Sequence, residues 1–342
     1  MPASDRPSRD TSDERTGDPT GAHTLGPHVV GTRVVVRRLV RGETGPSGGP
    51  AMTDLLGECV AWTPGPAGAL VVRREAGDLV RVPLADVVAG KPVPPRPSVH
   101  ARLDPARADL LAAPGWPATE QERLGGWLLR ASGGFSSRAN SVLAVTDPEV
   151  PLDDAVAHAE RWYVERGLRP CAHVLPGSAQ MHAFEDAAWA PYETTSLMLA
   201  SLSRVVRRLE APDVEVTESR SVDAGWLATD ERAARFGEAA LAVLEAGEVT
   251  LATVRDEHGE VVARGRGTVH GDWCGVAGLW TREDRRGEGL SRAVLAALLE
   301  RGAEAGATTT YLQVVESNEA ARALYEALGW AEHHQYLYLA AP

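Results

Sequence analysis

The residues with the clearest chemical potential form a glycine-containing stretch, DRRGEGLSR, at positions 284–292. It follows an apolar run at 276–281 and precedes residues whose apolar side chains recur at helical spacing. The glycines therefore lie at a predicted strand-to-helix turn. The first N–H groups of a helix have no acceptor within it, and glycine lets an anion approach them. These features make a phosphate-binding loop possible, but taken alone the glycine pair favours a turn that needs glycine only for its positive φ.

A second motif, LQVVESNEAARALYEALGW at 312–330, decides between these two interpretations. Together the motifs resemble those of the GNAT N-acetyltransferases, whose phosphate loop places Arg or Gln three residues before Gly and ends two residues later in Gly or Ala. Arg286 and Gly289 match this loop, whereas Ser291 stands at its last position. The later family signature is matched in order by Asn318, Ala321, Leu324, Tyr325, Gly329 and Trp330. The resemblance covers about residues 212–340.

The resemblance implies that acetyl-CoA is the acyl donor and that a primary amine attacks it directly in a ternary complex. Backbone N–H groups of the loop would bind the pyrophosphate, Arg286 would add positive charge, and the preceding strand would hold the pantetheine arm. The residues implied in this binding are Leu279, Thr281, Arg286, Gly287, Glu288, Gly289, Leu290, Ser291 and Asn318. Asn318 is also a favoured helix-capping residue, and the two roles are compatible.

Tyr325 matches the general acid of the family, which protonates the CoA thiolate when it leaves. Packing against the face of its own helix is the alternative role of this tyrosine. The general base is not identified, because residues 274–281, a strand that carries a glutamate in some family members, contain no carboxylate. The candidates are Glu316, Glu248, Asp272 and His270, and a water molecule or a group from the earlier part of the chain stays open.

The whole chain resembles an actinobacterial group of tandem GNAT proteins with an N-terminal SH3-like domain, and residues 125–127 and 138–141 fit that group. The first GNAT-like lobe has no phosphate motif, because its corresponding loop, 146–151, contains acidic residues and prolines. We therefore expect this lobe to shape the acceptor site rather than to bind CoA. The acceptor-site candidates are Trp127, Arg138, Asn140 and Glu316, with core packing as the alternative for Trp127.

Hydrophobic periodicity places these motifs in an α/β (α+β) chain of four parts. We predict a disordered tail at 1–27, an SH3-like small β-barrel at 28–92, a degenerate GNAT-like lobe at 98–204 and the catalytic GNAT domain at 212–342. Each lobe is expected to be a mixed, mostly antiparallel sheet flanked by helices. The strands expected in the barrel are 29–36, 57–62, 69–74 and 79–83, and those in the first lobe are 126–131, 140–145, 171–175 and 194–202. The catalytic domain is expected to contain the strands 214–217, 249–254, 261–269, 274–281, 309–315 and 334–339 and the helices 224–246, 288–301 and 319–328.

Composition narrows the function further. The formal net charge of −12 argues against nucleic-acid binding and mildly favours a cationic acceptor. No apolar run reaches the length of about 18 residues that spans a membrane. The three scattered cysteines predict neither a metal site nor a disulfide framework, and they are typical of the cytoplasm. A small-molecule amine and a protein amine both stay open as the acceptor, as does the oligomeric state.

Two other functions fit the same residues. Ser291 and the missing base favour an acetyl-CoA sensor with weak or no transfer activity. The SH3-like part at 28–92 favours a docking protein that recruits a protein partner. An acetyl-transfer assay across a panel of amines separates the enzyme from the sensor.

Overall fold

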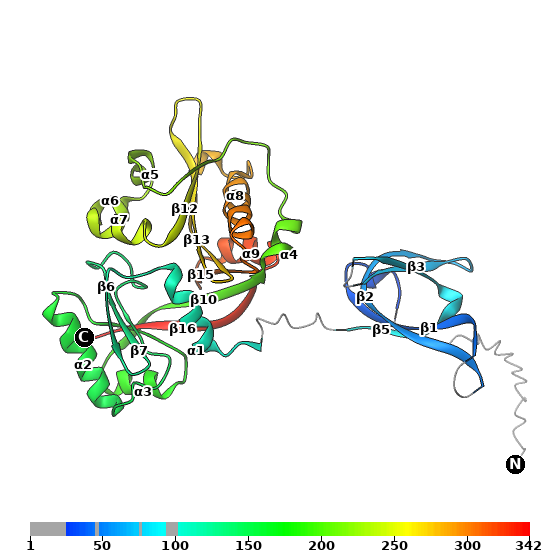
Figure 1. Ribbon diagram of the computed structural model, residues 1–342, viewed down its shortest axis with the longest axis horizontal. Helices are drawn as coiled ribbons and strands as arrows, with labels where there is room; N and C mark the ends of the chain where they lie inside the picture. The colour runs from blue at the N-terminus through cyan, green and yellow to red at the C-terminus, as the bar shows by residue number, and fades with distance from the viewer. Residues whose placement is uncertain (1–24, 45–47, 75–76, 94–101) are drawn as a thin grey trace, which may run out of the picture. The chain divides into compact units, whose positions relative to one another are not determined.

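The computed structural model describes residues 25–44, 48–74, 77–93 and 102–342 and divides into two compact units, with the boundary between Arg96 and Pro97 (Figure 1). Most of the tail predicted at 1–27 lies outside the described residues. Its last residues belong to the first unit, because Leu25 is buried in the core there and Pro27–Val29 form a short 3-10 helix. Within the described ranges no helix is long and apolar enough to cross a membrane.

The first unit is a 5-stranded antiparallel sheet with the order β4-β3-β2-β1-β5. Its strands are β1 (Arg33–Thr44), β2 (Pro50–Thr63), β3 (Ala69–Arg73), β4 (Leu79–Pro83) and β5 (Val87–Pro92). The predicted strand 57–62 starts seven residues too late, and β5 was not predicted. The outer part of the β1–β2 hairpin is paired but largely exposed, so it lacks the alternation of buried and exposed residues that marks a half-buried strand.

The second unit is built on an 11-stranded sheet, with the order β11-β12-β13-β14-β15-β10-β16-β9-β8-β7-β6. Its earlier strands are β6 (Glu120–Leu124), β7 (Trp127–Ala131), β8 (Val142–Leu143), β9 (Cys171–Val174) and β10 (Ala190–Ser201). The later strands are β11 (Thr217–Ser219), β12 (Glu248–Arg255), β13 (Val261–His270), β14 (Trp273–Thr281), β15 (Thr309–Val315) and β16 (Ala331–Ala340). Only the pairs β14–β15 and β8–β9 are parallel among the described strands, which confirms a mixed, mostly antiparallel sheet.

The two predicted lobes share this sheet because they exchange strands. Strand β10 of the first lobe lies between β15 and β16 of the second, and β16 in turn pairs with β9 of the first lobe (Figure 1). Thr195 illustrates the arrangement, since it pairs with Val315 on one side and with Tyr336 on the other. The predicted boundary at 204–212 therefore divides the sequence but not the sheet.

Helices cover both faces of the shared sheet. They are α1 (Pro105–Ala112), α2 (Leu152–Glu165), α3 (Ala179–Asp186), α4 (Leu202–Arg208), α5 (Ala224–Ala228), α6 (Glu231–Phe236), α7 (Glu238–Leu244), α8 (Leu290–Glu304) and α9 (Glu319–Leu328). Leu197 and Leu199 of β10 pack with α1, whereas Met198 and Ala200 belong to the cluster that contains α8. Successive residues of a strand point to opposite faces, so α1 and α8 lie on opposite sides of the sheet.

The helix predicted at 224–246 is wrong as a single element, because the structure breaks it into α5, α6 and α7. Asp223 and Asp230 each accept a hydrogen bond from a backbone N–H at the start of a new helix. Gly237 then adopts a positive φ of 52° between α6 and α7. The capping aspartates and the glycine interrupt the apolar periodicity only slightly, which is why the periodicity suggested one continuous helix.

Candidate functional site

The central feature of the site is a separation between two neighbouring strands. Strands β14 and β15 pair in parallel from Trp273–Thr309 to Val276–Leu312, and both continue beyond this point. A β-bulge redirects β14 there: Gly278 has a φ of 62°, and the register between Arg264 and Arg266 of β13 shifts. The segment 277–281 thus leaves β15 while it stays attached to β13, as a bulge with a left-handed glycine allows.

The loop after β14 presents a row of free backbone donors. The N–H groups from Gly287 to Ser291 have no hydrogen-bond acceptor among the described residues, and the first bonds of α8 are those from Arg292 and Ala293 to the Gly289 carbonyl. No side chain caps α8. Uncapped N–H groups and the positive end of the helix dipole together favour an anion at this position.

Glycine is required in this loop for two separate reasons. Gly287 and Gly289 adopt positive φ angles of 87° and 79°, which other residues rarely tolerate. A Cβ atom at Gly289 would also lie only 3.1 Å from the Pro212 Cδ atom. The turn interpretation and the phosphate interpretation are therefore both compatible with the geometry.

The acidic side chain between the two glycines of the loop is paired with a neighbouring arginine. The Arg285 guanidinium holds the Glu288 carboxylate with two hydrogen bonds of 2.8 Å, which offsets its negative charge. Arg286 is exposed, and Ser291 is half-buried in the first turn of α8.

Tyr325 and Asn318 lie on α9, which packs against the same apolar cluster as α8. The Tyr325 ring contacts Trp330 at a centroid distance of 5.8 Å, and the cluster also contains Leu279 and Leu290. Burial raises the pKa of the Tyr325 hydroxyl to about 12, and no described residue accepts or donates a hydrogen bond to it. Asn318 caps α9, since its side-chain oxygen accepts a 3.1 Å hydrogen bond from the Ala321 N–H.

A cavity of about 280 Å³ lies at the open end of the strand separation. Both lobes line it. Strands β14 and β15 contribute Ala277, Gly278, Gln313 and Val315, and the remaining lining residues are Trp116, Ser136, Ser137, Arg138, Glu193, Thr195, Arg232 and Tyr338. The structure thus brings the first lobe to the position where the separated strands end.

Of the acceptor-site candidates, only Arg138 lines this cavity. Trp127 is fully buried, stacks on Phe184 and donates to the Thr146 carbonyl at 2.8 Å, so it has the core-packing role. Asn140 accepts hydrogen bonds from the Ser132 and Gly134 N–H groups at 2.7 and 2.8 Å. It therefore holds the loop that presents Ser136 and Ser137.

The base candidates lie elsewhere. Glu316 is exposed beyond the end of β15, where its N–H bonds to the Thr194 carbonyl. The Asp272 carbonyl accepts the N–H groups of Thr308 and Thr309 in a turn. His270 bonds to the Tyr311 hydroxyl at 3.0 Å, and burial lowers its pKa. None of these three residues is among those that line the cavity.

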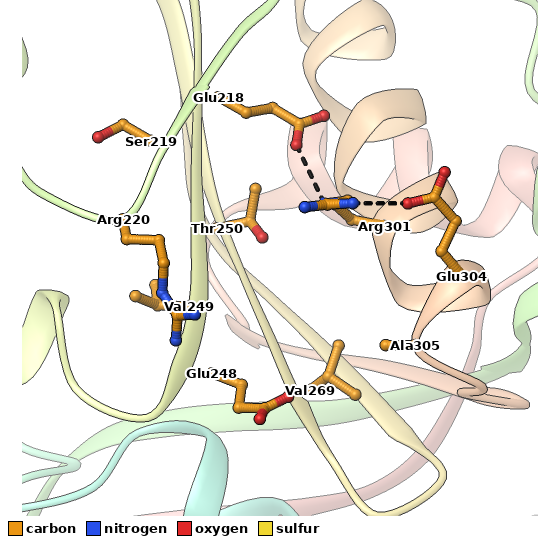
Figure 2. Close-up of a pocket in the computed structure, with 10 residues that line it drawn as sticks. All are labelled: Glu218, Ser219, Arg220, Glu248, Val249, Thr250, Val269, Arg301, Glu304 and Ala305. Atoms are coloured by element: carbon orange, nitrogen blue, oxygen red, sulfur yellow. Dashed lines mark hydrogen bonds and ion pairs between the residues drawn. The ribbon is translucent and has the colours of Figure 1, made fainter.

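Glu248 lines a different and larger cavity of about 520 Å³, drawn in Figure 2. This cavity lies by β11, β12 and the end of α8, away from the strand separation. Its charges largely satisfy one another, because Arg301 lies between Glu218 and Glu304 at 3.3 and 2.7 Å (Figure 2). We therefore place the candidate site at the smaller cavity.

Most of the residues that line the cavity were not predicted from the sequence, among them Trp116, Glu193 and Arg232. Glu193 is half-buried on β10, one position before the strand predicted at 194–202. No motif marks any of the three. The exchange of β10 into the second lobe, which places Glu193 at the cavity, has no local signal in the sequence.

The N-terminus of α2 in the first lobe differs from that of α8. Asp153 and Asp154 lie in its first turn, and Pro151 precedes it. The Thr146 carbonyl, in the loop before α2, accepts hydrogen bonds from the Trp127 and Gln180 side chains. The carboxylates of Asp153 and Asp154 disfavour an anion at this helix start, and the absence of CoA binding by this lobe stays a prediction. Among the described residues, no group of three or more His, Cys, Asp or Glu could hold a metal ion.

Two family descriptions match the chain. Residues 107–339 match a family described as "Probable histone acetyltransferase Rv0428c C-terminal", and residues 28–91 match one described as "Rv0428c N-terminal Sm-like domain". The Sm-like match is broadly consistent with the predicted SH3-like part.

Two relatives and one solved structure extend the comparison. The chain is 30% identical to the probable histone acetyltransferase Rv0428c of Mycobacterium tuberculosis. The aligned region of 301 residues covers 85% of this chain and 90% of that protein. The chain is also 29% identical to the uncharacterized N-acetyltransferase YobR of Bacillus subtilis. Here the aligned region of 245 residues covers 68% of this chain and 97% of that protein. A GCN5-related N-acetyltransferase from Kribbella flavida shares the fold, with a TM-score of 0.50 at 18% identity over 71% of this chain and 96% of that one.

Proposed function

The chain belongs to the GNAT family of N-acetyltransferases, and we propose that it moves the acetyl group of acetyl-CoA to a primary amine by direct attack. The observation that carries this proposal is the row of free N–H groups from Gly287 to Ser291, placed directly after a strand that has separated from its neighbour. The free N–H groups suit the pyrophosphate of acetyl-CoA, and the separated strand suits its extended pantetheine arm, which could pair with the exposed strand edge.

Residues of the second lobe would hold the donor. The N–H groups from Gly287 to Ser291 bind the pyrophosphate, and exposed Arg286 adds a positive charge beside it. Leu279 contributes through its backbone, because its side chain packs into the core. The Thr281 hydroxyl is buried and has no hydrogen-bond partner among the described residues, so it can form a hydrogen bond with the bound donor.

Two side chains act as general base and general acid in the transfer. As the nitrogen–carbon bond forms, Glu193 takes the proton that the attacking amine loses. As the carbon–sulfur bond breaks, the Tyr325 hydroxyl gives a proton to the sulfur atom. Glu193 is supported because it is the one carboxylate among the described residues that line the cavity. Tyr325 is supported because burial keeps its hydroxyl protonated.

The test is an assay of CoA release from acetyl-CoA with a panel of primary amines, combined with a titration of acetyl-CoA binding. We expect both binding and amine-dependent release. Binding without release for every amine would contradict the proposed function and favour the acetyl-CoA sensor.

A further inference from the structure

The cavity at the strand separation continues into a second one. This second cavity, of about 310 Å³, shares Ser136, Ser137, Glu193 and Arg232 with the first. The two cavities therefore adjoin, and we treat them together as one groove that extends from the strand separation to Arg169 and Tyr192. Its size suits a small molecule with two recognition points rather than one amine alone.

Positive charge dominates the groove. Arg138 lines the first cavity, Arg169 the second and Arg232 both, whereas Glu193 is the one carboxylate among the described lining residues. This balance is opposite to the formal net charge of −12 of the whole chain. The local field, and not the net charge, acts on a bound acceptor, because water and salt screen charges beyond about 10 Å.

None of these three arginines has a carboxylate within ion-pairing distance in the described part of the chain. Aromatic rings hold them instead: Arg138 lies 5.3 Å from the Trp116 ring centroid, Arg169 lies 5.4 Å from that of Tyr192, and Arg232 lies 5.9 Å from that of Phe236. A cation–π contact does not use the N–H groups of a guanidinium, so those of exposed Arg169 and Arg232 can still bind an anion. By contrast, Arg264 nearby is paired with Asp230 at 3.0 Å.

Resting on the proposed function, we propose that the acceptor is a small amine that also carries an anionic group, a carboxylate or a phosphate. Glu193 binds the amine at the part that both cavities share, where Arg232 also lies, and Arg232 and Arg169 bind the anionic group, Arg169 from the second cavity. An arginine edge matches the geometry of either anion with two parallel hydrogen bonds. Glu193 repels an acceptor that has only the anionic group, and the arginines repel one that has only positive charges.

The test compares acceptors in matched pairs, using CoA release by the full chain. Amino acids are paired with their carboxamides, and aminoalkyl phosphates with the corresponding amino alcohols; 1,4-diaminobutane represents cationic acceptors. We expect the anionic member of at least one class of pair to have a kcat/KM about 10- to 100-fold above that of its neutral partner. The class with the larger ratio identifies the anion as carboxylate or phosphate.

Variants locate the anion site. Arg232→Gln should lower the ratio of kcat/KM between the anionic acceptor and its neutral partner to near one, whatever the change in kcat/KM that both acceptors share. Arg235→Gln is the matched control: Arg235 lies on the same helix and near the same Phe236 ring, at 5.1 Å, but does not line the groove. This control should behave like the unmodified protein. Both arginines are exposed, so neither change should disturb folding.

Three outcomes would overturn the inference. Equal kcat/KM for all paired acceptors, or a higher value for 1,4-diaminobutane, would show that no anionic group is recognised. An equal loss for both members of a pair in Arg232→Gln would show that Arg232 does not bind the anion. Release from no amine at all, with acetyl-CoA bound, would remove the proposed function itself and is therefore distinguishable from the first two.

Discussion

The Tyr325 hydroxyl is the proton donor in the proposed transfer, and its surroundings suit that role. A thiolate that leaves during the attack needs a proton from a group that is still protonated at neutral pH. Partial burial against the α8–α9 cluster keeps the hydroxyl in that form. The same burial explains why the tyrosine also contributes to packing, so the two roles predicted for it are compatible.

Replacing Tyr325 with Phe tests the acid role with little change in packing. We expect kcat to fall about 100-fold or more, because the leaving thiolate loses its proton donor. The affinity for acetyl-CoA, measured by calorimetric titration, should stay within about twofold, since the ring is retained. A matching loss of affinity and turnover would show that Tyr325 is a structural residue.

The pH dependence of kcat gives an independent check on Tyr325. Its protonated form is the active one, so activity is present below its pKa and lost above it. Because burial raises this pKa to about 12, the loss should move to higher pH than for an ordinary tyrosine. With both substrates saturating, kcat should stay constant from about pH 8 to about pH 10. A decline centred near pH 10 would contradict this assignment.

Glu193 and Glu316 are rival bases, and the same substitution discriminates between them. In Glu193→Gln, kcat/KM for the amine should fall about 100-fold, because the carboxylate in the cavity is replaced by an amide. In Glu316→Gln it should change by no more than about twofold, because Glu316 is exposed outside the cavity. The opposite ranking in a steady-state assay would assign the base to Glu316.

At the scale of elements, the loop between β14 and α8 combines two requirements. It must turn sharply, which positive φ angles at Gly287 and Gly289 allow, and it must leave N–H groups free, which the uncapped helix start provides. A side chain at Gly289 therefore disturbs both the turn and the proposed pyrophosphate site.

Gly289→Asp should weaken acetyl-CoA binding at least about 100-fold, because it adds a strained side chain and a negative charge beside the anion. Gly306→Asp supplies the matched control. Gly306 also has a positive φ, of 88°, and has open space around it, but it lies beyond the other end of α8. Calorimetry should show normal binding for this control, and normal binding in Gly289→Asp as well would refute the phosphate loop.

Glycines also determine how closely α8 lies on the sheet. A Cβ atom at Gly265 of β13 would lie 2.8 Å from side-chain atoms of both Leu279 and Val294, so α8 can pack this closely on β13 only because this residue has no side chain. The same residue lies opposite the bulge in β14. A Cβ atom at Gly302 of α8 would likewise lie 2.7 Å from the Cys274 Sγ atom, so the position of α8, and with it the loop, depends on glycines that no family motif marks.

At the scale of the molecule, the exchange of β10 and β16 makes the two lobes one folding unit. Both neighbours of β10, a strand of the first lobe, belong to the second lobe, and both neighbours of β16, a strand of the second lobe, belong to the first. Strand β10 also has buried residues on both of its faces. A lobe without its partner would expose the backbone edge and the apolar faces that these strands cover.

Separate expression of residues 102–208 and 209–342 should therefore give insoluble or unfolded protein for each piece. Co-expression should restore a folded complex, since all strand neighbours are then present. Circular dichroism and size-exclusion chromatography check both results. Two soluble, cooperatively folded pieces would show that the lobes are independent domains, as the predicted boundary at 204–212 suggested.

Much of the site could be predicted from the sequence because its signals are local. The glycine pair, the capping Asn318 and the spacing to Tyr325 each depend on residues within one turn or one helix. Most strands and helices were also placed correctly by periodicity. The failures, such as the divided helix at 224–246 and the outer part of β2, occur where caps or exposed pairing replace a clear apolar pattern.

The sequence by itself determined the family, the loop and the helix that carries Tyr325, because short-range backbone preferences and capping specify these elements. Only the tertiary structure decided which groups line the groove proposed for the acceptor. Glu193, Arg232 and Arg169 come from β10, from α6 and from the segment before β9, and long-range strand exchange brings them into one groove. Pairing between distant strands depends on the burial of whole faces rather than on any local residue pattern, so these residues gave no signal in the sequence.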